Sequence, residues 1–152
     1  LAHRPWMQYT LTTSRRTPAD FIVGLHSLSA PNLRVVPFSQ TQPGWVAEQL
    51  AQSATAWVSE DSVSMVYEAL TAQVAVGLLN LPLKQENRVS RGVEHLLQQG
   101  MIVRFDSDAH YQQRLHPVAG FTEADRCANW ILRRWLQPVP ASVPQVATAT
   151  IA

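Results

Sequence analysis

The chain has 152 residues, of which 46% are hydrophobic and 15% charged, and its formal net charge at pH 7 is +1. This length and composition suit one ordered domain with a buried core, and the charge gives no general case for binding nucleic acid or a membrane surface. A single cysteine, Cys127, excludes a disulfide framework and a cysteine-based metal site. No signal-peptide pattern opens the sequence, and no apolar run approaches the length of a membrane span.

The charge is unevenly distributed, and the chain begins at Leu1 rather than at a methionine. The first forty residues hold four arginines and one aspartate, so this quarter of the chain is basic. The first residue leads us to expect a fragment or a trimmed product. The single cysteine is compatible with a reducing compartment. We therefore expect a cytoplasmic protein, with peripheral attachment to a membrane as the alternative.

Apolar runs of strand type alternate with stretches of helical spacing along the whole chain. In chain order the sequence predicts a strand at 6–13, a helix at 17–30, a strand at 33–38, a helix at 45–53, a strand at 55–58, a helix at 62–70, a strand at 74–79, a helix at 87–100, a strand at 101–105 and a helix from 122 onward. Residues 137–152 are rich in Pro, Ala, Val and Thr and predict an extended tail.

This alternation predicts the class of fold. Strands that are apolar throughout and alternate with helices indicate a parallel sheet covered on both faces. Right-handed crossovers make such a sheet a doubly wound, Rossmann-like domain. We therefore expect an α/β domain over residues 1–136, with a mostly parallel five-stranded sheet and helices on both faces, followed by the tail at 137–152.

Helix starts and apolar stripes predict how the helices are oriented. Thr17 before Pro18, and Thr122 followed by Asp125, are typical N-terminal caps. The apolar stripes of the first, third and last helices predict the side chains that face the core. These are Phe21, Leu25 and Leu28; Val63, Val66, Tyr67 and Leu70; and Cys127, Ala128, Ile131, Leu132 and Trp135.

Several common catalytic and nucleotide-binding motifs are missing from the sequence. The first strand is not followed by GxGxxG, and there is no glycine–lysine P-loop, which argues against a nicotinamide site and a Walker NTPase. The GxSxG elbow of α/β-hydrolases is also missing. The five histidines are scattered, with His110 and His116 in one loop and His26 and His95 on helices. For each we favour a surface or structural role over metal binding or base catalysis.

Two polar loops follow the first and third predicted strands. The first loop, residues 13–17, holds Ser14, Arg15 and Arg16, and the second, residues 59–64, holds Ser62, Val63 and Ser64. In open α/β sheets, ligands bind outside the carboxyl ends of the strands. Both loops lead into helix N-termini, where free N–H groups and the helix dipole favour an anion. Because guanidinium groups bind phosphate oxygens in a bidentate manner, the two loops predict a diphosphate site.

Each of these residues also has a purely structural interpretation. Asp61 or Ser62 can cap the helix that follows. Arg15 and Arg16 can form a solvated basic turn, although basic groups at a helix N-terminus oppose the dipole and an anion would remove that conflict. Glu68, on the next turns of the helix, is either a surface charge or an acceptor for ribose hydroxyls.

The two loops together resemble a known family. SRRTP at 14–18 after a strand, EDSVSM at 60–65 with Glu68-Ala69 downstream, and GMIVRF at 100–105 resemble the ELM family. These are the bacterial "mitochondrial fission ELM" proteins, often labelled as predicted nucleoside-diphosphate-sugar epimerases. The likeness covers about residues 6–136.

The resemblance implies a GT-B architecture, in which two Rossmann-like domains face each other across a cleft. This chain looks like the C-terminal domain, which holds the nucleotide-sugar donor in GT-B glycosyltransferases and similar epimerases. By position, Ser62, Val63 and Ser64, together with Ser14, Arg15 and Arg16, match the diphosphate contacts, and Glu68 matches the ribose contact. The resemblance places the catalytic base on an N-terminal domain that this chain lacks, so the chain alone is expected to be inactive.

Three functional hypotheses follow. The first is the nucleotide-sugar-binding half of a glycosyltransferase or epimerase, needing no cofactor and no metal because no DxD-type acidic cluster is present. The second is a non-catalytic protein that keeps the fold and binds a partner, since plant members of the family are linked to recruiting division machinery to mitochondria. The third is a flavodoxin-like domain for another phosphate ligand. Apolar surface exposed without the N-terminal domain would favour a homodimer.

Overall fold

The computed structural model of the chain describes residues 5–28, 30–81, 88–105 and 115–136. The elements in chain order are β1 (Tyr9–Thr12), α1 (Ala19–His26), β2 (Leu33–Val36), a 3₁₀ turn η1 (Phe38–Gln40), α2 (Trp45–Ala51), β3 (Thr55–Ser59), α3 (Val63–Thr71), β4 (Ala75–Leu79), α4 (Arg88–Gln98), β5 (Ile102–Arg104) and α5 (Glu123–Trp135). The predicted order of strands and helices is therefore confirmed, and the expected tail at 137–152 lies outside the described residues.

The strands form two parallel sheets, so the prediction of one five-stranded sheet is wrong. β1 pairs with β2, and β3, β4 and β5 form a second sheet in that order. Within the described part of the chain, no strand pairing joins the two sheets. The eight residues predicted for the first strand shorten to four, which alternate between half-buried and exposed. That alternation is typical of a strand with one solvated face, whereas a central strand of a doubly wound sheet is buried on both faces.

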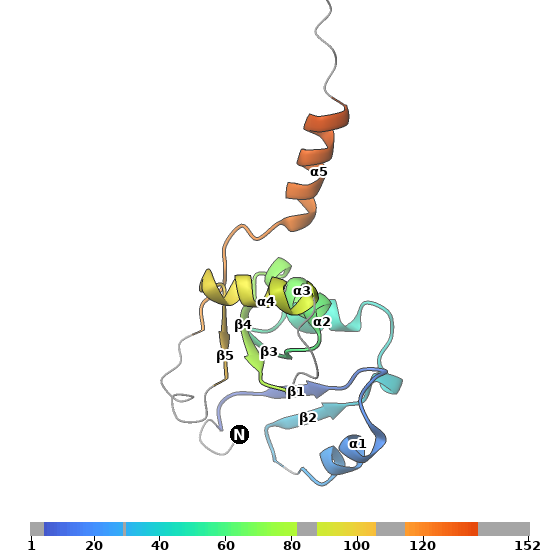
Figure 1. Cartoon of the computed structure of the whole chain (residues 1–152). Helices are drawn as coiled ribbons and strands as arrows, with labels where there is room; N and C mark the ends of the chain where they lie inside the picture. Colours follow the sequence, from blue (N-terminus) through green and yellow to red (C-terminus); the bar gives the residue numbers. More distant parts are fainter. Residues whose placement is uncertain (1–4, 29, 82–87, 106–114, 137–152) are drawn as a thin grey trace, which may run out of the picture.

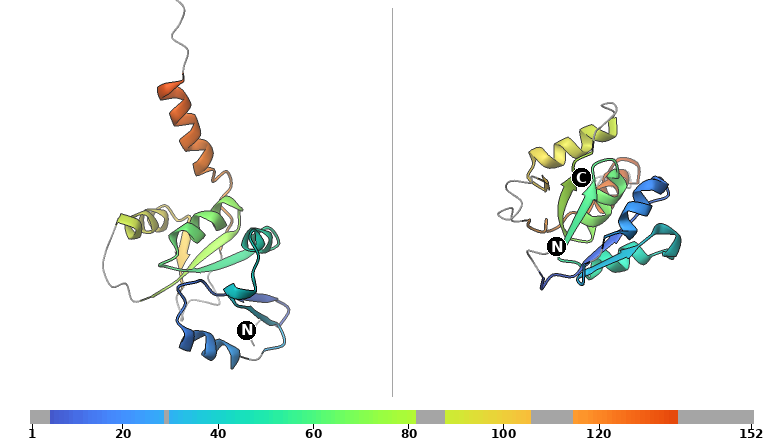
Figure 2. Two further views of the ribbon diagram at one scale, coloured as in Figure 1. Left: turned by 90° about the vertical axis from the view of Figure 1, so that its right-hand side faces the viewer. Right: turned by 90° about the horizontal axis from the view of Figure 1, so that it is seen from below.

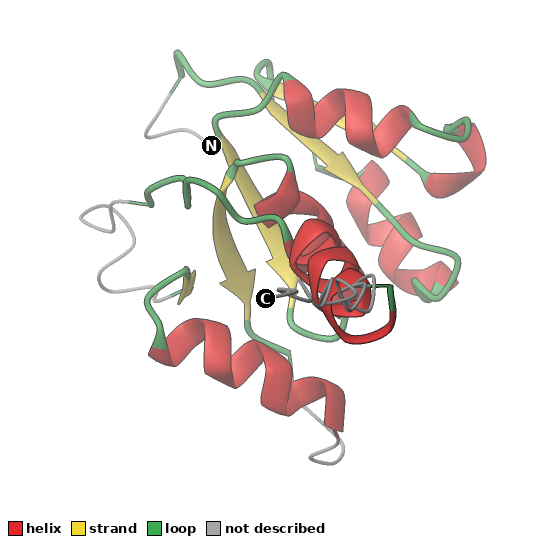
Figure 3. Ribbon diagram, turned by 90° about the horizontal axis from the view of Figure 1, so that it is seen from above, coloured by secondary structure: helices red, strands yellow, loops and turns green. Residues whose placement is uncertain are grey.

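The core lies between the three-stranded sheet and helices α3 and α4. Val66 and Leu70 of α3 are fully buried, which confirms that the predicted stripe of this helix faces inward. On β4 the buried run is continuous over its first four residues, as expected for a strand covered on both faces. Val93 of α4 completes this core. Helices flank the strands on both sides, as the views from below and above show (Figures 2 and 3), and this agrees with the Rossmann-like class.

The first helix differs from its prediction at its start and along its buried face. Thr17 does not cap α1, because its hydroxyl accepts a hydrogen bond from the Ser14 N–H at 2.9 Å, and Pro18 occupies the cap position. Leu25 is buried as predicted, but Phe21 and Leu28 are exposed. A two-stranded sheet is narrower than the five-stranded sheet that was expected, and it leaves part of the apolar face of α1 uncovered.

The last helix projects away from the rest of the molecule (Figures 1 and 2). None of its residues is buried, so the predicted inward stripe of Cys127, Ala128, Ile131, Leu132 and Trp135 is wrong for this structure. Thr122 makes no side-chain cap hydrogen bond. Helical spacing shows which face of a helix is apolar but not whether another element covers it.

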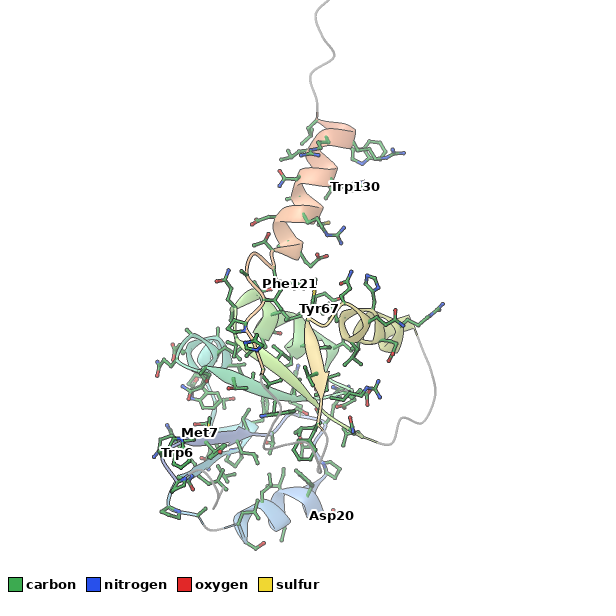
Figure 4. The ribbon with its side chains drawn as sticks, turned by 90° about the vertical axis from the view of Figure 1, so that its left-hand side faces the viewer. Trp6, Met7, Asp20, Tyr67, Phe121 and Trp130 are labelled. Atoms are coloured by element: carbon green, nitrogen blue, oxygen red, sulfur yellow. The ribbon has the colours of Figure 1, made fainter. Side chains whose placement is uncertain are left out.

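Just before α5, the chain is held to the core by Phe121. This side chain is buried, and its ring lies 5.8 Å from the ring of Tyr67 on α3 (Figure 4). Beyond that point the first turn of α5 forms its own ion pair. The pKa of Glu123 is lowered mainly because Arg126 hydrogen-bonds its carboxylate. Phe121 is therefore the last buried residue before the exposed helix.

The remaining helix boundaries follow local sequence. α4 begins at Arg88, and residue 87, where the sequence predicted its start, lies outside the described residues. Gly100, the last residue of that predicted helix, has φ +67°, which is typical of the left-handed residue after a helix C-terminus. The second strand ends at Val36, two residues before its predicted end, because Pro37 lacks the N–H that a strand ladder requires.

Candidate functional site

The loops after β1 and β3 lie next to each other. The side chain of Arg16 reaches from the first loop to the second, where its Nη2 lies 3.5 Å from Ser62 Oγ and 3.6 Å from Asp61 Oδ2. Both loops follow the carboxyl ends of strands. Because the strands are parallel within each sheet, each loop lies at the edge of its sheet where ligands bind in open α/β folds. The structure thus brings together two of the residue groups that the sequence assigned to a diphosphate site, although the two strands belong to different sheets.

The first loop is a tight turn held by its own serine and threonine. The Arg16 N–H donates to Ser14 Oγ at 3.1 Å, and the Thr17 N–H donates to the Ser14 carbonyl at 3.1 Å. Ser14 thus acts within the turn and orients the arginines. Arg15 and Arg16 diverge, since the Arg15 guanidinium carbon lies 5.7 Å from the ring centroid of Phe38. Of the two guanidinium groups, the structure places that of Arg16 at the second loop.

The second loop leads into α3 without a side-chain cap. Ser62 occupies the cap position, but its hydroxyl makes no cap hydrogen bond, so the capping interpretation does not describe this structure. The N–H groups of the first turn of a helix have no partner within the helix. Ser64 is exposed and Val63 half-buried at the start of that turn. Exposed backbone donors, the Ser62 hydroxyl and the Arg16 guanidinium together suit an anion with several oxygens.

A cavity of about 320 Å³ begins at Thr13 of the first loop, and we call it the rim pocket. Its lining comes from the end of β1, from η1, from the start of α2 and from α3. The residues are Thr12, Thr13, Phe38, Thr41, Gln42, Pro43, Gly44, Val46, Ala47 and Glu68. Glu68 is exposed and contributes the acidic group of this pocket. Glu68, which the sequence assigned to ribose, therefore lines the same cavity as Thr13 of the first loop.

A groove between α2 and α3 adjoins the rim pocket. A second cavity of about 470 Å³ is lined there by Ala47, Leu50, Tyr67, Glu68, Thr71, Ala72, Glu123 and Ala124. Glu68 and Ala47 line both cavities. Most of the residues of the second cavity are apolar, and those at its far end come from the last turn of α3 and the start of α5. Its lining therefore offers less to a polar ligand than the rim pocket does.

Sequence reasoning missed an acidic residue next to the site. Glu60, 6% exposed, lies between β3 and α3, and its Oε1 is 2.7 Å from Nη2 of Arg104 on β5. The same guanidinium lies 3.1 Å from Glu94 Oε2 on α4. This pair neutralises the buried carboxylate and ties the second loop to β5. Glu60 and Asp61 are adjacent acidic residues, and nothing in the sequence shows that the first is buried and the second exposed.

The described residues contain no group of three or more histidine, cysteine, aspartate or glutamate side chains that could hold a metal ion. Of the two loop histidines, His116 is exposed, and His110 lies outside the described residues. Within the described parts of the chain, no helix has the length and apolar character needed to cross a membrane.

Comparison with known proteins identifies a family. The family model described as "Mitochondrial fission ELM1" matches residues 1–135. No curated protein matches the chain, and neither does a solved structure. The match covers both loops and the rim pocket, as well as all of α5.

Proposed function

This chain belongs to the mitochondrial fission ELM1 family, and we propose that it binds a nucleoside diphosphate sugar at the loops that follow β1 and β3. The diphosphate lies between Arg16 and the start of α3, and Glu68 accepts hydrogen bonds from the ribose hydroxyls. The domain then serves as the donor-binding half of a protein with GT-B architecture. The family name alone does not specify this ligand, so the proposal rests on the geometry of the site.

The observation that carries the proposal is the meeting of the two loops. Arg16 comes 46 residues before Ser62 in the sequence, yet their side chains lie 3.5 Å apart at an uncapped helix N-terminus. A basic side chain in that position opposes the helix dipole. A bound diphosphate would satisfy the guanidinium and the helix donors at the same time. Ser14 and Ser64 border this position, while Arg15 points to Phe38 and contributes only indirectly.

The role of such a site in catalysis would be electrostatic. Positive charge and backbone donors that are fixed in place stabilise the negative charge that develops on a nucleoside-diphosphate leaving group. These groups need no proton transfer, and a general base would have to come from outside this site. We therefore expect this chain by itself to bind the donor without turning it over.

A thermal-shift screen tests the proposal directly. The chain is heated with UDP, GDP, CDP or ADP, and with sugar conjugates of each, at equal ionic strength. A ligand that binds only the folded state at one hundred times its Kd stabilises the protein by about 2.7 kcal/mol. We expect one base to raise the Tm clearly above the others. Equal, negligible shifts for every nucleotide and for pyrophosphate would contradict the proposal.

A second candidate function is partner binding without catalysis, and α5 favours it. Trp130 and Trp135 are 59% and 69% exposed on a helix of which no residue is buried. Large exposed apolar patches often mark protein interaction sites. The test is pairwise binding between this chain and purified components of a mitochondrial fission machinery. A loss of binding in Trp130→Ser/Trp135→Ser, but not in Arg16→Ala, would support this function. Failure of the wild-type chain to bind any of the components would contradict it.

A further inference from the structure

The rim pocket has an aromatic side chain at its edge that the proposed diphosphate and ribose contacts do not use. Phe38 is 45% exposed, and none of the residues of η1 is buried. It lines the same cavity as Glu68 and Thr13. An exposed ring beside a ribose-binding carboxylate is chemically suited to a planar heterocycle, because bases stack on aromatic faces.

The backbone of Phe38 is fixed from both sides. Its N–H donates to Thr13 Oγ1 at 2.9 Å, so the residue is tied to the end of β1 where the arginine loop begins. Its carbonyl oxygen accepts a hydrogen bond from Thr41 Oγ1 at 2.8 Å. Both threonines also line the rim pocket. The backbone that carries the ring is thus held in position before any ligand arrives, which lowers the entropic cost of binding.

Arg15 contacts the same ring without lining the pocket. Its guanidinium carbon lies 5.7 Å from the centroid of Phe38, within the range of a cation–π interaction, and Arg15 is not among the residues that line the cavity. The arginine therefore supports the ring from outside the pocket. Within one loop, Arg16 is directed to the second loop and Arg15 to the aromatic ring.

From this arrangement we infer that the rim pocket binds the nucleobase of the ligand, with Phe38 as the stacking platform and Arg15 as the residue that positions it. The inference rests on the proposed function, because it extends the ligand from the diphosphate through the ribose to the base. It also changes the expected role of Arg15 from phosphate contact to support of the base. Gln42, whose amide both donates and accepts hydrogen bonds, lines the pocket and can contact the base edge.

The experiment compares two probes that share phosphate chemistry and differ in the base. Isothermal titration of the full chain gives the Kd of the tightest nucleoside diphosphate and the Kd of inorganic pyrophosphate. We expect Phe38→Ala to weaken nucleoside diphosphate binding by about 5- to 150-fold, the range for a lost base–aromatic stack, and to leave pyrophosphate binding unchanged. Arg16→Ala should weaken both probes by similar factors.

Matched variants separate stacking from general damage. Phe21→Ala removes another exposed phenylalanine, on α1, and should change neither Kd. Phe38→Tyr keeps the aromatic face and should retain most of the affinity. Arg15→Gln should weaken nucleoside diphosphate binding by about two- to fivefold, as an exposed cation–π contact does, again without affecting pyrophosphate. This selective loss is what distinguishes support of the base from contact with the phosphates.

The possible failures are distinguishable. If the wild-type chain binds neither nucleoside diphosphates nor pyrophosphate, the proposed function is wrong and this inference is overturned with it. If the wild type binds nucleoside diphosphates but Phe38→Ala leaves their Kd unchanged, or weakens pyrophosphate equally, the diphosphate site stands and the base lies elsewhere. A circular dichroism melt of each variant confirms that the compared proteins are folded.

Discussion

Two adjacent arginines on one short turn have different surroundings, and this difference defines the site at the scale of single residues. Arg16 lies beside Ser62 and Asp61, whereas Arg15 lies over Phe38. Neighbouring side chains on a turn point in different directions. Two arginines that are adjacent in a sequence motif therefore need not contact the same group. The two side chains can be tested separately because Arg16 contacts the second loop and Arg15 contacts the ring of Phe38.

Removing the phosphate-binding groups should reduce affinity and leave the fold intact. We expect Arg16→Ala or Ser62→Ala to weaken nucleoside diphosphate binding by about 1–3 kcal/mol, because each removes a charge-assisted or hydroxyl hydrogen bond. Titration calorimetry measures the change. Arg34→Ala, an exposed arginine on β2, is the matched control for loss of one positive charge. Equal effects of Arg34→Ala and Arg16→Ala would reduce the site to a general electrostatic attraction.

Asp61 competes with a phosphate group for Arg16. Its carboxylate lies 3.6 Å from the guanidinium, and both side chains are well exposed, so the pair itself adds little stability. Asp61→Asn removes a negative charge near the diphosphate and leaves a neutral amide, which competes less strongly for the guanidinium. We expect it to tighten nucleoside diphosphate binding, by about two- to tenfold at low salt and less at high salt. Weaker binding at both salt concentrations would show that Asp61 contacts the ligand itself.

At the scale of elements, close packing of the three-stranded sheet depends on one glycine. Gly77 on β4 lies opposite Trp57 on β3, and a Cβ at this position would overlap the indole ring. We expect Gly77→Ala to destabilise the protein by about 1–3 kcal/mol, since the half-buried indole ring must move against the ring of Phe105. Chemical denaturation measures this cost. Gly24→Ala, in the exposed part of α1 with no atom near the added methyl group, should instead stabilise by about 0.4–1 kcal/mol.

The last helix and the residue before it should contribute very differently to stability. A chain that ends at Thr122 loses α5, none of whose residues is buried, and we expect its free energy of unfolding to change by less than about 0.5 kcal/mol. Phe121→Ala should cost about 3–5 kcal/mol, because the ring is buried against Tyr67. Denaturant melts of both variants measure this. A large loss on truncation would show that α5 packs on the body in solution.

Local sequence patterns predicted the elements well, and contacts distant in sequence much less well. The stripe of α3 and the buried run of β4 follow from periodicity, which a single segment carries by itself. The exposure of α5 depends on what lies opposite it, and no residue of that helix encodes this. The rim pocket was missed for a related reason. Phe38 and Thr13 lie at the ends of different elements, and only the fold brings the N–H of one to the hydroxyl of the other.

At the scale of the whole molecule, the candidate site bridges two sheets that share no strand pairing in the described part of the chain. The smaller sheet supplies Arg16 and leads into Phe38, and the larger sheet leads into Ser62 and Glu68. The buried core belongs mainly to the larger sheet with α3 and α4. Regions with few buried apolar contacts open more easily than the core. The two halves of the site therefore differ in local stability.

This difference predicts how a ligand changes the dynamics of the molecule. In amide hydrogen exchange followed by mass spectrometry, β1 and β2 should exchange faster than β4 in the free protein, because β4 is buried and pairs with strands on both sides. A nucleoside diphosphate at one hundred times its Kd contacts loops of both sheets and binds only when they are correctly placed, so protection should rise by up to about 2.7 kcal/mol in β1 and β2. In Arg16→Ala, at the same ligand concentration, the rise in protection should be smaller because the variant binds the nucleoside diphosphate more weakly. Protection that rises equally in β4, or only around β3 and α3, would place the ligand on the larger sheet alone and contradict a site shared by the two sheets.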